Sequence, residues 1–321
     1  MNDTLLGIVK LLNDHDYIDG NSIGAKLNIT RAAVWKNIHQ LQQQYGIAIR
    51  ASKAKGYKLQ QPLILLDQDK IKQKLIHEQV KLECFNSIDS TNRYLQDIND
   101  DTYLYHICLA EHQSKGKGRF SRSWSSPFGQ NIYLSLKTNL TKDMSELSGL
   151  SLSIATVIAN VIHKDFPILN PKIKWPNDIY LNDSKLSGVL IEVKAESNYQ
   201  SQVIIGIGLN VNMTQQNEIN QEWISLLKAT GATVDRNQLA THLINALIDA
   251  LIVFQNKGFT PFIDAYQSLD YLTGKTISLS LPNNTIITGI CHGINQHGHI
   301  MLKKNDKIHT FASGEASCYQ S

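Results

Sequence analysis

A short basic loop near the middle of the chain carries the residue types that bind an anion. It is Gly116-Lys117-Gly118-Arg119-Phe120-Ser121-Arg122-Ser123-Trp124, which places three cations, two glycines and two hydroxyls within nine residues. Glycines let backbone N–H groups approach an anion, and the cations neutralise its charge. The loop is not a Walker phosphate loop, because no Gly-Lys-Ser/Thr follows a glycine at the required spacing. A flexible basic surface loop is the alternative that composition leaves open.

Three further segments contain candidate ligand-binding residues. Lys174-Trp175-Pro176-Asn177-Asp178, with Lys185 seven residues beyond, offers cations and a carboxylate that suit phosphate and magnesium. Ser87–Asn92 precedes a helical stretch, where free N–H groups and hydroxyls can meet a polar ligand. Gly206–Asn212 begins like a dinucleotide fingerprint, but Val211 replaces the third glycine and no helix is expected after it. An Asx turn, a helix cap and a tight strand, in that order, are the structural alternatives.

Other chemistries find little support in the sequence. We see neither a nucleophile elbow joining a strand to a helix nor a His-Glu-x-x-His helix. His292, His297 and His299 cluster in a glycine-containing hairpin without Cys or carboxylate at ligand spacing, so we expect no dedicated metal site. The four cysteines form no Cys-x-x-Cys pair and no dense disulfide framework.

The elements that must position these segments alternate between strand-like and helical patterns, which predicts a mixed α/β domain. From Gly274 onward, short alternating segments separated by turns predict a small β-barrel. The expected central strands are Tyr103–Leu109, Ile132–Leu136, Lys172–Trp175, Val189–Val193 and Val203–Val211, and the expected helices are Asp69–Ile76, Thr91–Ile98, Leu147–His163 and Arg236–Gln255.

The first 62 residues differ from the rest in charge. They carry eight Lys/Arg and four Asp/Glu, and no acid lies between Asp19 and Pro62. Apolar spacing predicts three helices, the second opened by Asn21 or Ser22 and the third capped by Thr30, followed by a β-hairpin with a basic tip. This pattern favours a winged helix-turn-helix that binds DNA, and a protein-interaction domain with a solvated basic face is the alternative. The residues expected to meet DNA are Ser22, Thr30, Arg31, Ala32, Trp35, Lys36, Lys53 and Lys55.

Length and composition are those of an ordinary globular protein with two or three domains: 321 residues, 42% hydrophobic, 18% charged, net charge +3. No apolar run reaches the about 18–20 residues that cross a bilayer. The longest, Leu147–Ile162 and Leu243–Phe254, are broken by polar residues. The start of the chain lacks a signal-peptide pattern. We therefore expect a cytoplasmic protein without membrane association.

Taken in order, the segments resemble the bifunctional biotin protein ligases that also repress the biotin operon. The order is a winged helix, Ser-Thr-Asn, Gln-x-x-Gly-Lys-Gly-Arg, Lys-Trp-Pro-Asn-Asp, Lys-Leu-x-Gly and Gly-x-Gly-x-Asn, and it covers nearly the whole chain. The resemblance implies an α+β fold in three parts. These are a winged helix-turn-helix (1–62), a mixed α/β biotin- and ATP-binding catalytic domain (67–270) and a small SH3-like β-barrel (274–321).

The resemblance also implies biotin, ATP and Mg²⁺ as ligands, a biotin carboxyl carrier protein as acceptor, and a homodimer that binds operator DNA when the adenylate is bound. Lys185, Arg119 and Arg122 become catalytic cations that cancel the repulsion between a carboxylate and an α-phosphate. The biotin-binding residues implied are Ser90, Thr91, Asn92, Gln113, Gly116, Lys117, Gly118, Arg119, Lys185, Gly188, Gly206 and Gly208. The ATP-binding residues implied are Arg119, Arg122, Trp124, Asn177, Asp178 and Asn210.

One position departs from the family pattern, since Lys117 stands where many members have Arg. Lysine keeps the charge but loses the bidentate fork, so we expect weaker ordering of the loop and weaker retention of the adenylate. Two other functions stay open: a DNA-binding sensor with an inactive ligand domain, and a lipoate ligase of related fold.

Overall fold

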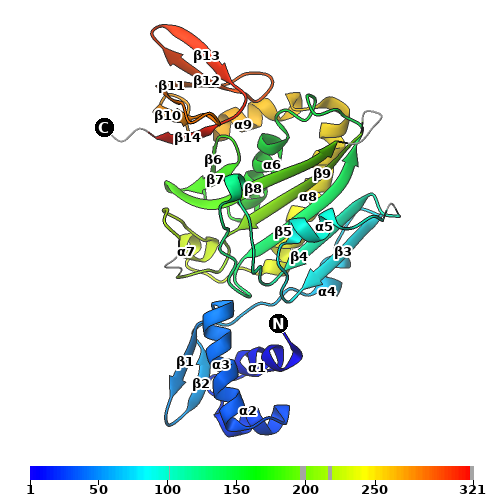
Figure 1. Cartoon of the computed structure of the whole chain (residues 1–321), viewed down its shortest axis with the longest axis vertical. Coiled ribbons are helices and arrows are strands. Elements are labelled where there is room, and N and C mark those ends of the chain that lie inside the picture. Colours follow the sequence, from blue (N-terminus) through cyan, green and yellow to red (C-terminus); the bar gives the residue numbers. More distant parts are fainter. Residues whose placement is uncertain (101, 196–199, 216–218, 319–321) are drawn as a thin grey trace.

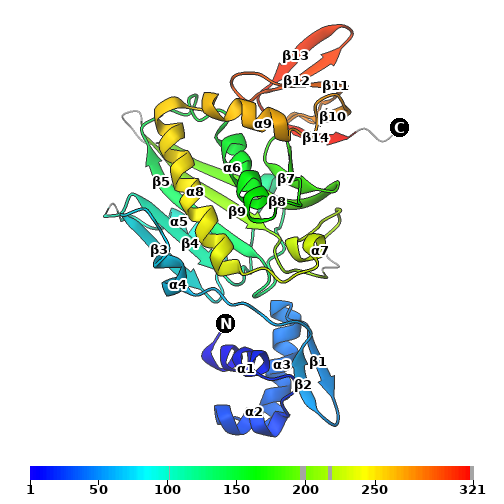
Figure 2. The same ribbon diagram turned by 180° about the vertical axis from the view of Figure 1, so that it is seen from behind.

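The chain is elongated, with its N-terminal module at one end and its C-terminal sheet at the other (Figures 1 and 2). The computed structural model describes residues 1–100, 102–195, 200–215 and 219–318. The last three residues of the expected C-terminal domain, 274–321, therefore lie outside the described residues. The α+β class expected from the sequence is confirmed.

The N-terminal module is the expected winged helix-turn-helix. Its core is built from the inner faces of three helices and the hairpin, and this cluster also takes in Leu63 and Phe128 from later in the chain. Thr30 caps the third helix as predicted, because its hydroxyl accepts a hydrogen bond from the N–H of Ala33 at 3.1 Å. The elements are α1 (Asp3–Asn13), α2 (Gly20–Leu27), α3 (Arg31–Tyr45), β1 (Ile49–Ser52) and β2 (Gly56–Leu59).

The start of α2 differs from the sequence expectation, which placed the opening at Asn21 or Ser22. Asp19 is the cap, because its carboxylate accepts hydrogen bonds from the N–H groups of both residues. A carboxylate at this position also interacts favourably with the positive end of the helix dipole. The helix therefore begins at Gly20.

A seven-stranded mixed sheet forms the centre of the molecule, in the order β3-β4-β5-β9-β8-β7-β6. Only β3 and β4 run parallel. The long helices α6 (Leu150–Asp165) and α8 (Arg236–Lys257) cover one face, and α5 (Thr91–Gln96) lies on the other (Figures 1 and 2). The strands are β3 (Val80–Phe85), β4 (Tyr105–Ala110), β5 (Ile132–Leu140), β6 (Lys172–Lys174), β7 (Asp178–Leu181), β8 (Ser184–Ala195) and β9 (Ser201–Leu209).

Several central elements were missed or misjudged from the sequence. The strands β3 and β7 and the short helices α7 (Leu226–Thr230) and α9 (Ile263–Leu269) had not been expected. The helix expected over Asp69–Ile76 is shorter, since α4 covers Gln68–Lys72. After α4 the N–H groups of Lys74 and Leu75 donate to the carbonyls of Ile71 and Lys72, three residues earlier, so the chain continues in a tighter 3₁₀-type turn and the α-helix ends.

The C-terminal strands form an antiparallel sheet in the order β13-β12-β11-β10-β14. Its apolar side, including Ile277, Leu279 and Leu302, belongs to the same buried cluster as the central domain. Trp175 fastens the two together, since its Nε1 donates to the carbonyl of Gly298 at 2.9 Å. The strands are β10 (Thr276–Ser280), β11 (Ile286–Ile294), β12 (Ile300–Lys304), β13 (Lys307–Phe311) and the unexpected β14 (Glu315–Cys318).

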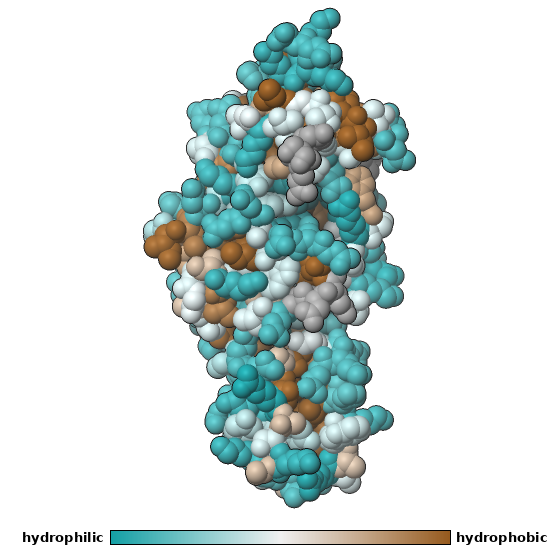
Figure 3. All heavy atoms as spheres, turned by 90° about the vertical axis from the view of Figure 1, so that its left-hand side faces the viewer, coloured by the Kyte–Doolittle hydropathy of each residue, from teal (hydrophilic) through white to brown (hydrophobic). Residues whose placement is uncertain are grey.

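By length and composition, α8 is the one described helix that could cross a membrane. Over its apolar 18-residue stretch, 56% is buried inside the protein, as in the core helix of a globular domain. On the face shown in Figure 3, hydrophilic residues cover the tip of the C-terminal sheet, and hydrophobic residues elsewhere form separate patches.

Candidate active site

A cavity beside the ends of β6, β7 and β14 brings together the four segments singled out in the sequence. Residues 116–124 are here called the flap, and most of them line one wall of this cavity. Backbone hydrogen bonds from Gly118 to Arg122 and from Trp124 to Gly116 close the flap on itself. Every residue expected to bind biotin or ATP lines this cavity except Gly116 and Asn210, which line an adjoining groove.

A buried polar network lies at one end of the cavity. Ser90 caps α5 and presents the two residues that follow it, Thr91 and Asn92. The Thr91 N–H donates to Gln113 Oε1 at 2.9 Å, and Asn92 Nδ2 donates to Glu192 Oε2 at 2.6 Å. Ser135 Oγ lies 2.7 Å from Thr91 Oγ1 and 2.5 Å from Asn92 Oδ1. The network therefore holds an array of donors and acceptors in fixed orientations, which suits a polar ligand.

Ser135 and Glu192 were not identified from the sequence. Ser135 is fully buried in a mostly apolar strand and pairs directly with Gly206 of the neighbouring strand. The sequence did contain a signal for Ser135, namely a small polar residue within an apolar strand. Because successive strand residues face opposite sides of the sheet, such a residue marks one face as polar at that point. Glu192 gave no comparable signal.

Two glycines of β9 are needed for close approach by side chains. A Cβ at Gly206 would lie 2.3 Å from Asn92 Oδ1, and a Cβ at Gly208 would lie 2.3 Å from Cε2 of Trp124. Both separations are well inside van der Waals contact, so no larger residue fits at either position. The two glycines therefore let the side chains of Asn92 and Trp124 approach the strand closely.

Trp124 lies inside the cavity. Its indole rests on Gly208 and also approaches Gly188, where a Cβ would lie 3.3 Å from Cζ3. The indole Nε1 is buried and has no hydrogen-bond partner among the described residues. Trp124, which the resemblance places among the ATP-binding residues, therefore packs against Gly188 and Gly208, which it places among the biotin-binding residues. Trp124 thus lies where the two expected sets of residues meet.

Each cation expected to act in catalysis is held by an oxygen of the protein itself. Lys185 Nζ lies 2.8 Å from Asp178 Oδ2. Arg122 forms a two-pronged ion pair with Glu315, with Nη2 and Oε2 at 2.6 Å. Arg119 donates to Asn177 Oδ1 at 3.4 Å, and also to the Gly314 carbonyl at 3.2 Å. An anionic ligand would replace these internal acceptors.

The arginine contacts also shift proton affinities. Burial lowers the pKa of Arg119, with carboxylates nearby opposing it, and the guanidinium stays charged at neutral pH. The hydrogen bond with Glu315 raises the pKa of Arg122, and the same bond lowers the pKa of Glu315. Glu315 belongs to the C-terminal sheet, for which the sequence had predicted no site residue, and no local pattern marks it.

The tip of the flap is strained. Phe120 and Ser121 both have left-handed backbone angles, with φ of 54° and 58°. Such angles are uncommon outside glycine, and strain of this kind persists only where the surroundings enforce it. The guanidinium carbons of Arg119 and Arg122 lie 4.9 and 5.9 Å from the centre of the Phe120 ring, so one aromatic ring contacts both.

The residues present can supply one ligand to a nucleotide-bound magnesium ion. Asp178 Oδ1 is buried and has no hydrogen-bond partner within the part of the chain that the structure describes. Magnesium commonly takes one or two protein carboxylates and completes its shell with phosphate and water. No group of three or more His, Cys, Asp and Glu among the described residues could hold a metal by itself.

The residues expected to meet DNA lie on one module but play different local roles. Arg31, Ala32, Trp35 and Lys36 are exposed on α3, and Lys53 and Lys55 are exposed at the turn between β1 and β2. The Thr30 hydroxyl is engaged in the cap of α3. The Ser22 hydroxyl donates to Asp19 at 2.5 Å.

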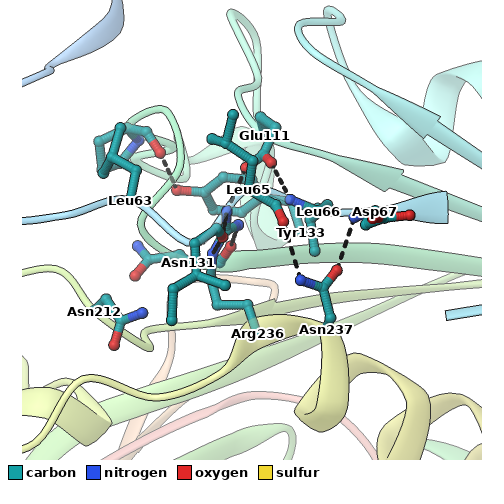
Figure 4. A network of polar contacts seen from close by, with 12 residues as sticks. Leu63, Leu65, Leu66, Asp67, Glu111, Asn131, Tyr133, Asn212, Arg236 and Asn237 are labelled. Carbon is teal, nitrogen blue, oxygen red and sulfur yellow. Dashed lines mark hydrogen bonds and ion pairs between the residues drawn. The ribbon is translucent and has the colours of Figure 1, made fainter. Parts of the chain in front are cut away.

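The module is joined to the ligase domain through a buried polar cluster around the linker (Figure 4). The fully buried Arg236 donates to the Ile64 carbonyl through Nε at 3.0 Å and to Glu111 Oε2 through Nη2 at 2.6 Å. Asn237 accepts from the N–H of Asp67 at 2.7 Å and donates to the Leu65 carbonyl at 3.0 Å. We call this cluster the linker clamp.

A second contact runs from α3 to both ends of the segment that carries the flap. Tyr45 packs against His112, with ring centres 4.9 Å apart, and against Phe128, at 6.3 Å. The N–H of Phe128 donates to the Tyr45 carbonyl at 2.9 Å. Neither partner was identified from the sequence, because the contact joins residues that are far apart along the chain.

Two family models match this chain. Residues 84–210 match the biotin/lipoate A/B protein ligase family, and residues 4–58 match an HTH domain. The bifunctional ligase/repressor BirA of Salmonella typhimurium is 37% identical over 99% of this chain and 98% of its own length. The protein of the same name from Bacillus subtilis is 30% identical over 94% of each chain. The chain belongs to the bifunctional ligase/repressor BirA family.

Structural similarity agrees with this membership. A biotin protein ligase from Aquifex aeolicus, solved in complex with biotin and ATP, superposes with a TM-score of 0.65 and 28% identity, covering 75% of this chain and 99% of that one. The two segments matched by the family models contain different sets of the expected site residues. All the expected biotin and ATP residues fall within 84–210, and all the expected DNA residues fall within 4–58. Glu315 lies outside both segments.

Proposed function

We propose that this protein joins biotin to ATP to form biotinyl-5′-AMP, transfers the biotinyl group to a lysine of a biotin carboxyl carrier protein, and represses transcription through its winged helix. The comparisons show a biotin protein ligase domain and an HTH DNA-binding domain in one chain. The observation that carries the assignment of residues is the cavity, which gathers cations, glycines and a polar network from four separate segments.

We assign biotin to the end of the cavity with the buried polar network. Thr91, Asn92 and Gln113 would bind its polar head group, and Gly206 leaves room for that contact. Lys185 would hold the biotin carboxylate where the two ends of the cavity meet. The remaining biotin residues of this proposal are Ser90, Gly116, Lys117, Gly118, Arg119, Gly188 and Gly208.

We assign ATP to the end of the cavity formed by the flap tip, Asn177 and Asp178, with Asn210 in the adjoining groove. A carboxylate oxygen of biotin attacks the α-phosphorus, and pyrophosphate leaves. Both reactants are anions, so the step needs positive charge placed before the reaction begins. Arg119, Arg122 and Lys185 supply that charge. Without ligand, Asp178 and Glu315 offset two of these three charges, and Arg119 is held by uncharged oxygens, so the cavity keeps a net positive charge. An anionic ligand would exchange these internal partners for its own phosphate and carboxylate oxygens.

Magnesium would enter with the nucleotide, and the unpaired Asp178 Oδ1 is the protein oxygen suited to it. The ion supplies charge neutralisation on the phosphates. The proposal requires no dedicated protein cage, because magnesium bound with a nucleotide takes most of its ligands from phosphate and water.

In the second step the acceptor lysine amine attacks the acyl carbon, and AMP leaves. The protein supplies no covalent nucleophile. The mixed anhydride must be kept from water between the two steps, and a flap whose cations bind the adenylate provides that protection. Lys117, in place of arginine, offers a single point charge to this closure.

The rest of the proposal concerns assembly and location. We propose domain boundaries of 1–62, 67–270 and 274–321, a homodimer in the adenylate-bound state, operator DNA as partner, and a cytoplasmic location without membrane association. The adenylate would favour the dimer by binding it more tightly than the monomer.

The ligase proposal is tested with Lys185→Ala, with Lys164→Ala on the exposed end of α6 as matched control. In Lys185→Ala we expect the rate of adenylation to fall by about tenfold or more, because one of the three cations is lost. The rate is measured as the release of pyrophosphate. The control should match the unaltered protein. A normal rate in Lys185→Ala would remove this residue from the mechanism.

Mass spectrometry of a carrier domain incubated with biotin, ATP and magnesium separates the alternative functions. No gain in carrier mass would favour a ligand sensor without ligase activity, and preferential gain from lipoate would favour a lipoate ligase. Deleting residues 1–62, which leaves the linker clamp in place, should abolish DNA binding and spare much of the ligase activity.

A further inference from the structure

The outward face of α3 carries an uncharged strip between cations. Ala32, Trp35 and His39 are exposed and lie three and four residues apart, so they follow one line along the helix. The Trp35 side chain is 63% exposed. Its ring lies parallel to that of His39, with centres 5.7 Å apart and planes at 4°. The two rings therefore stack on each other along the helix, and each restricts the orientation of the other.

Trp35 has no part in the core of the module. The inner face of α3 is formed by Val34, Ile38 and Leu41, which are buried with the other two helices. Among residues 1–62, all of which the structure describes, Trp35 is the one large hydrophobic residue that is exposed. The fold therefore does not account for an aromatic residue at this position.

The charges around the strip indicate what it meets. Arg31 and Lys36 flank it, and the sequence of α3 contains no acid. Such a surface complements a polyanion, whose phosphates would meet the cations on either side of the strip. In a DNA major groove the apolar feature within reach of an uncharged side chain is the C5-methyl group of thymine.

We propose that Trp35, held by His39, selects DNA sites by contacting thymine methyl groups in the major groove. This inference rests on the proposed repressor function and specifies which base feature the recognition helix reads. Arg31 and Lys36 set the affinity through phosphates, and the strip sets the preference for thymine.

Replacement of thymine by deoxyuridine tests the proposal, because it removes only the methyl group. The full-length protein, with biotin and ATP–magnesium, first selects duplexes from a random library. Each thymine of the selected site is then replaced singly, and affinities are measured for the unaltered protein and its variants. We expect about fourfold weaker binding for each contacted methyl, the effect of one buried carbon group.

The variants separate base contact from phosphate contact. Trp35→Ala should bind thymine and deoxyuridine duplexes equally, and Trp35→Phe should keep the difference because an aromatic ring remains. The dependence of affinity on salt should stay unchanged in both, since no charge is lost, and should become shallower in Arg31→Ala. Gln43→Ala, exposed near the other end of α3, is the matched control.

Three results would overturn the proposal. The first is a selected site in which no thymine is sensitive to methyl removal. The second is a thymine preference that persists in Trp35→Ala. The third is Trp35→Ala binding DNA as tightly as the unaltered protein, which would assign the strip to a protein partner. A chain that selects no duplex at all would overturn the repressor function as well, so the two failures are distinguishable.

Discussion

Two arginine–carboxylate pairs in this molecule have the same chemistry and different surroundings. The pair Arg236–Glu111 lies in the linker clamp, where the two side chains are 0% and 4% exposed. The pair Arg122–Glu315 joins the flap to the C-terminal sheet, where the side chains are 64% and 41% exposed. Both pairs connect segments that are more than a hundred residues apart along the chain.

The buried pair is embedded in further hydrogen bonds. Arg236 also donates to the carbonyls of Ile64 and Asn131, and Glu111 also accepts from the N–H of Leu66 (Figure 4). Water cannot replace any of these partners, so separating them leaves buried charge. The exposed pair is open to water and to phosphate. Burial therefore keeps Arg236 and Glu111 paired, whereas Arg122 and Glu315 can exchange each other for water or for a phosphate.

The largest effect is expected from Arg236→Met. The variant leaves the Glu111 carboxylate buried without its partner, so the free energy of unfolding should fall by about 3–5 kcal/mol. Urea denaturation followed by circular dichroism measures this change. The double variant Glu111→Leu/Arg236→Met should recover part of the loss, because it buries no unpaired charge.

A loss below about 1 kcal/mol in Arg236→Met would contradict the comparison, since exposed ion pairs have that effect. The same denaturation curves distinguish a local opening of the joint from global unfolding. Local opening would give separate transitions for the module and the ligase domain.

A change of pH is expected to have an intermediate effect on stability. The residue responsible is His112, which packs against Tyr45. Burial, and secondly the positive charge of the N-terminal amine, lower the pKa of His112 from 6.5 to about 4. The unfolded chain therefore binds a proton that the folded chain does not, and stability is lost as pH falls from 6.5 toward 4. His112→Asn should flatten this part of the stability profile measured by thermal unfolding. An unchanged profile would exclude His112 as its source.

The smallest effect on stability is expected from Glu315→Gln. The exposed flap pair should contribute less than about 1 kcal/mol to the free energy of unfolding, and raising the salt concentration should reduce the contribution further. Urea denaturation at low and high salt checks both points. If Glu315→Gln were as destabilising as Arg236→Met, exposure would not be what separates the two pairs.

Local sequence patterns were enough to single out segments that the structure brings together at one cavity. The flap, Lys174–Asp178 and Gly206–Asn212 each place charged or polar residues, with glycines in the first and last of them, over a few consecutive positions, and residues from all three line the cavity. The cap at Thr30 was predictable for the same reason, since it depends on a side chain and an N–H three residues apart.

The sequence was insufficient where a residue acquires its role by pairing across the fold. Glu315 meets Arg122 only because β14 pairs with β10 and so brings the start of that strand to the flap. Glu111 directly follows β4 and Arg236 is the first residue of α8, so the two meet only because the fold places the end of β4 beside the start of α8. Such pairings depend on strand order and helix placement, which no short segment encodes.

The position of Tyr45 provides a direct mechanical coupling between the winged-helix module and the ligase domain. One ring at the last turn of α3 contacts both stems of the flap-bearing segment, His112 and Phe128. A shift of either stem is therefore transmitted to α3 through Tyr45, without passing through the linker. Thermodynamic reciprocity then applies: whatever orientation of α3 a bound adenylate favours, DNA that selects that orientation must hold the adenylate more tightly by the same factor.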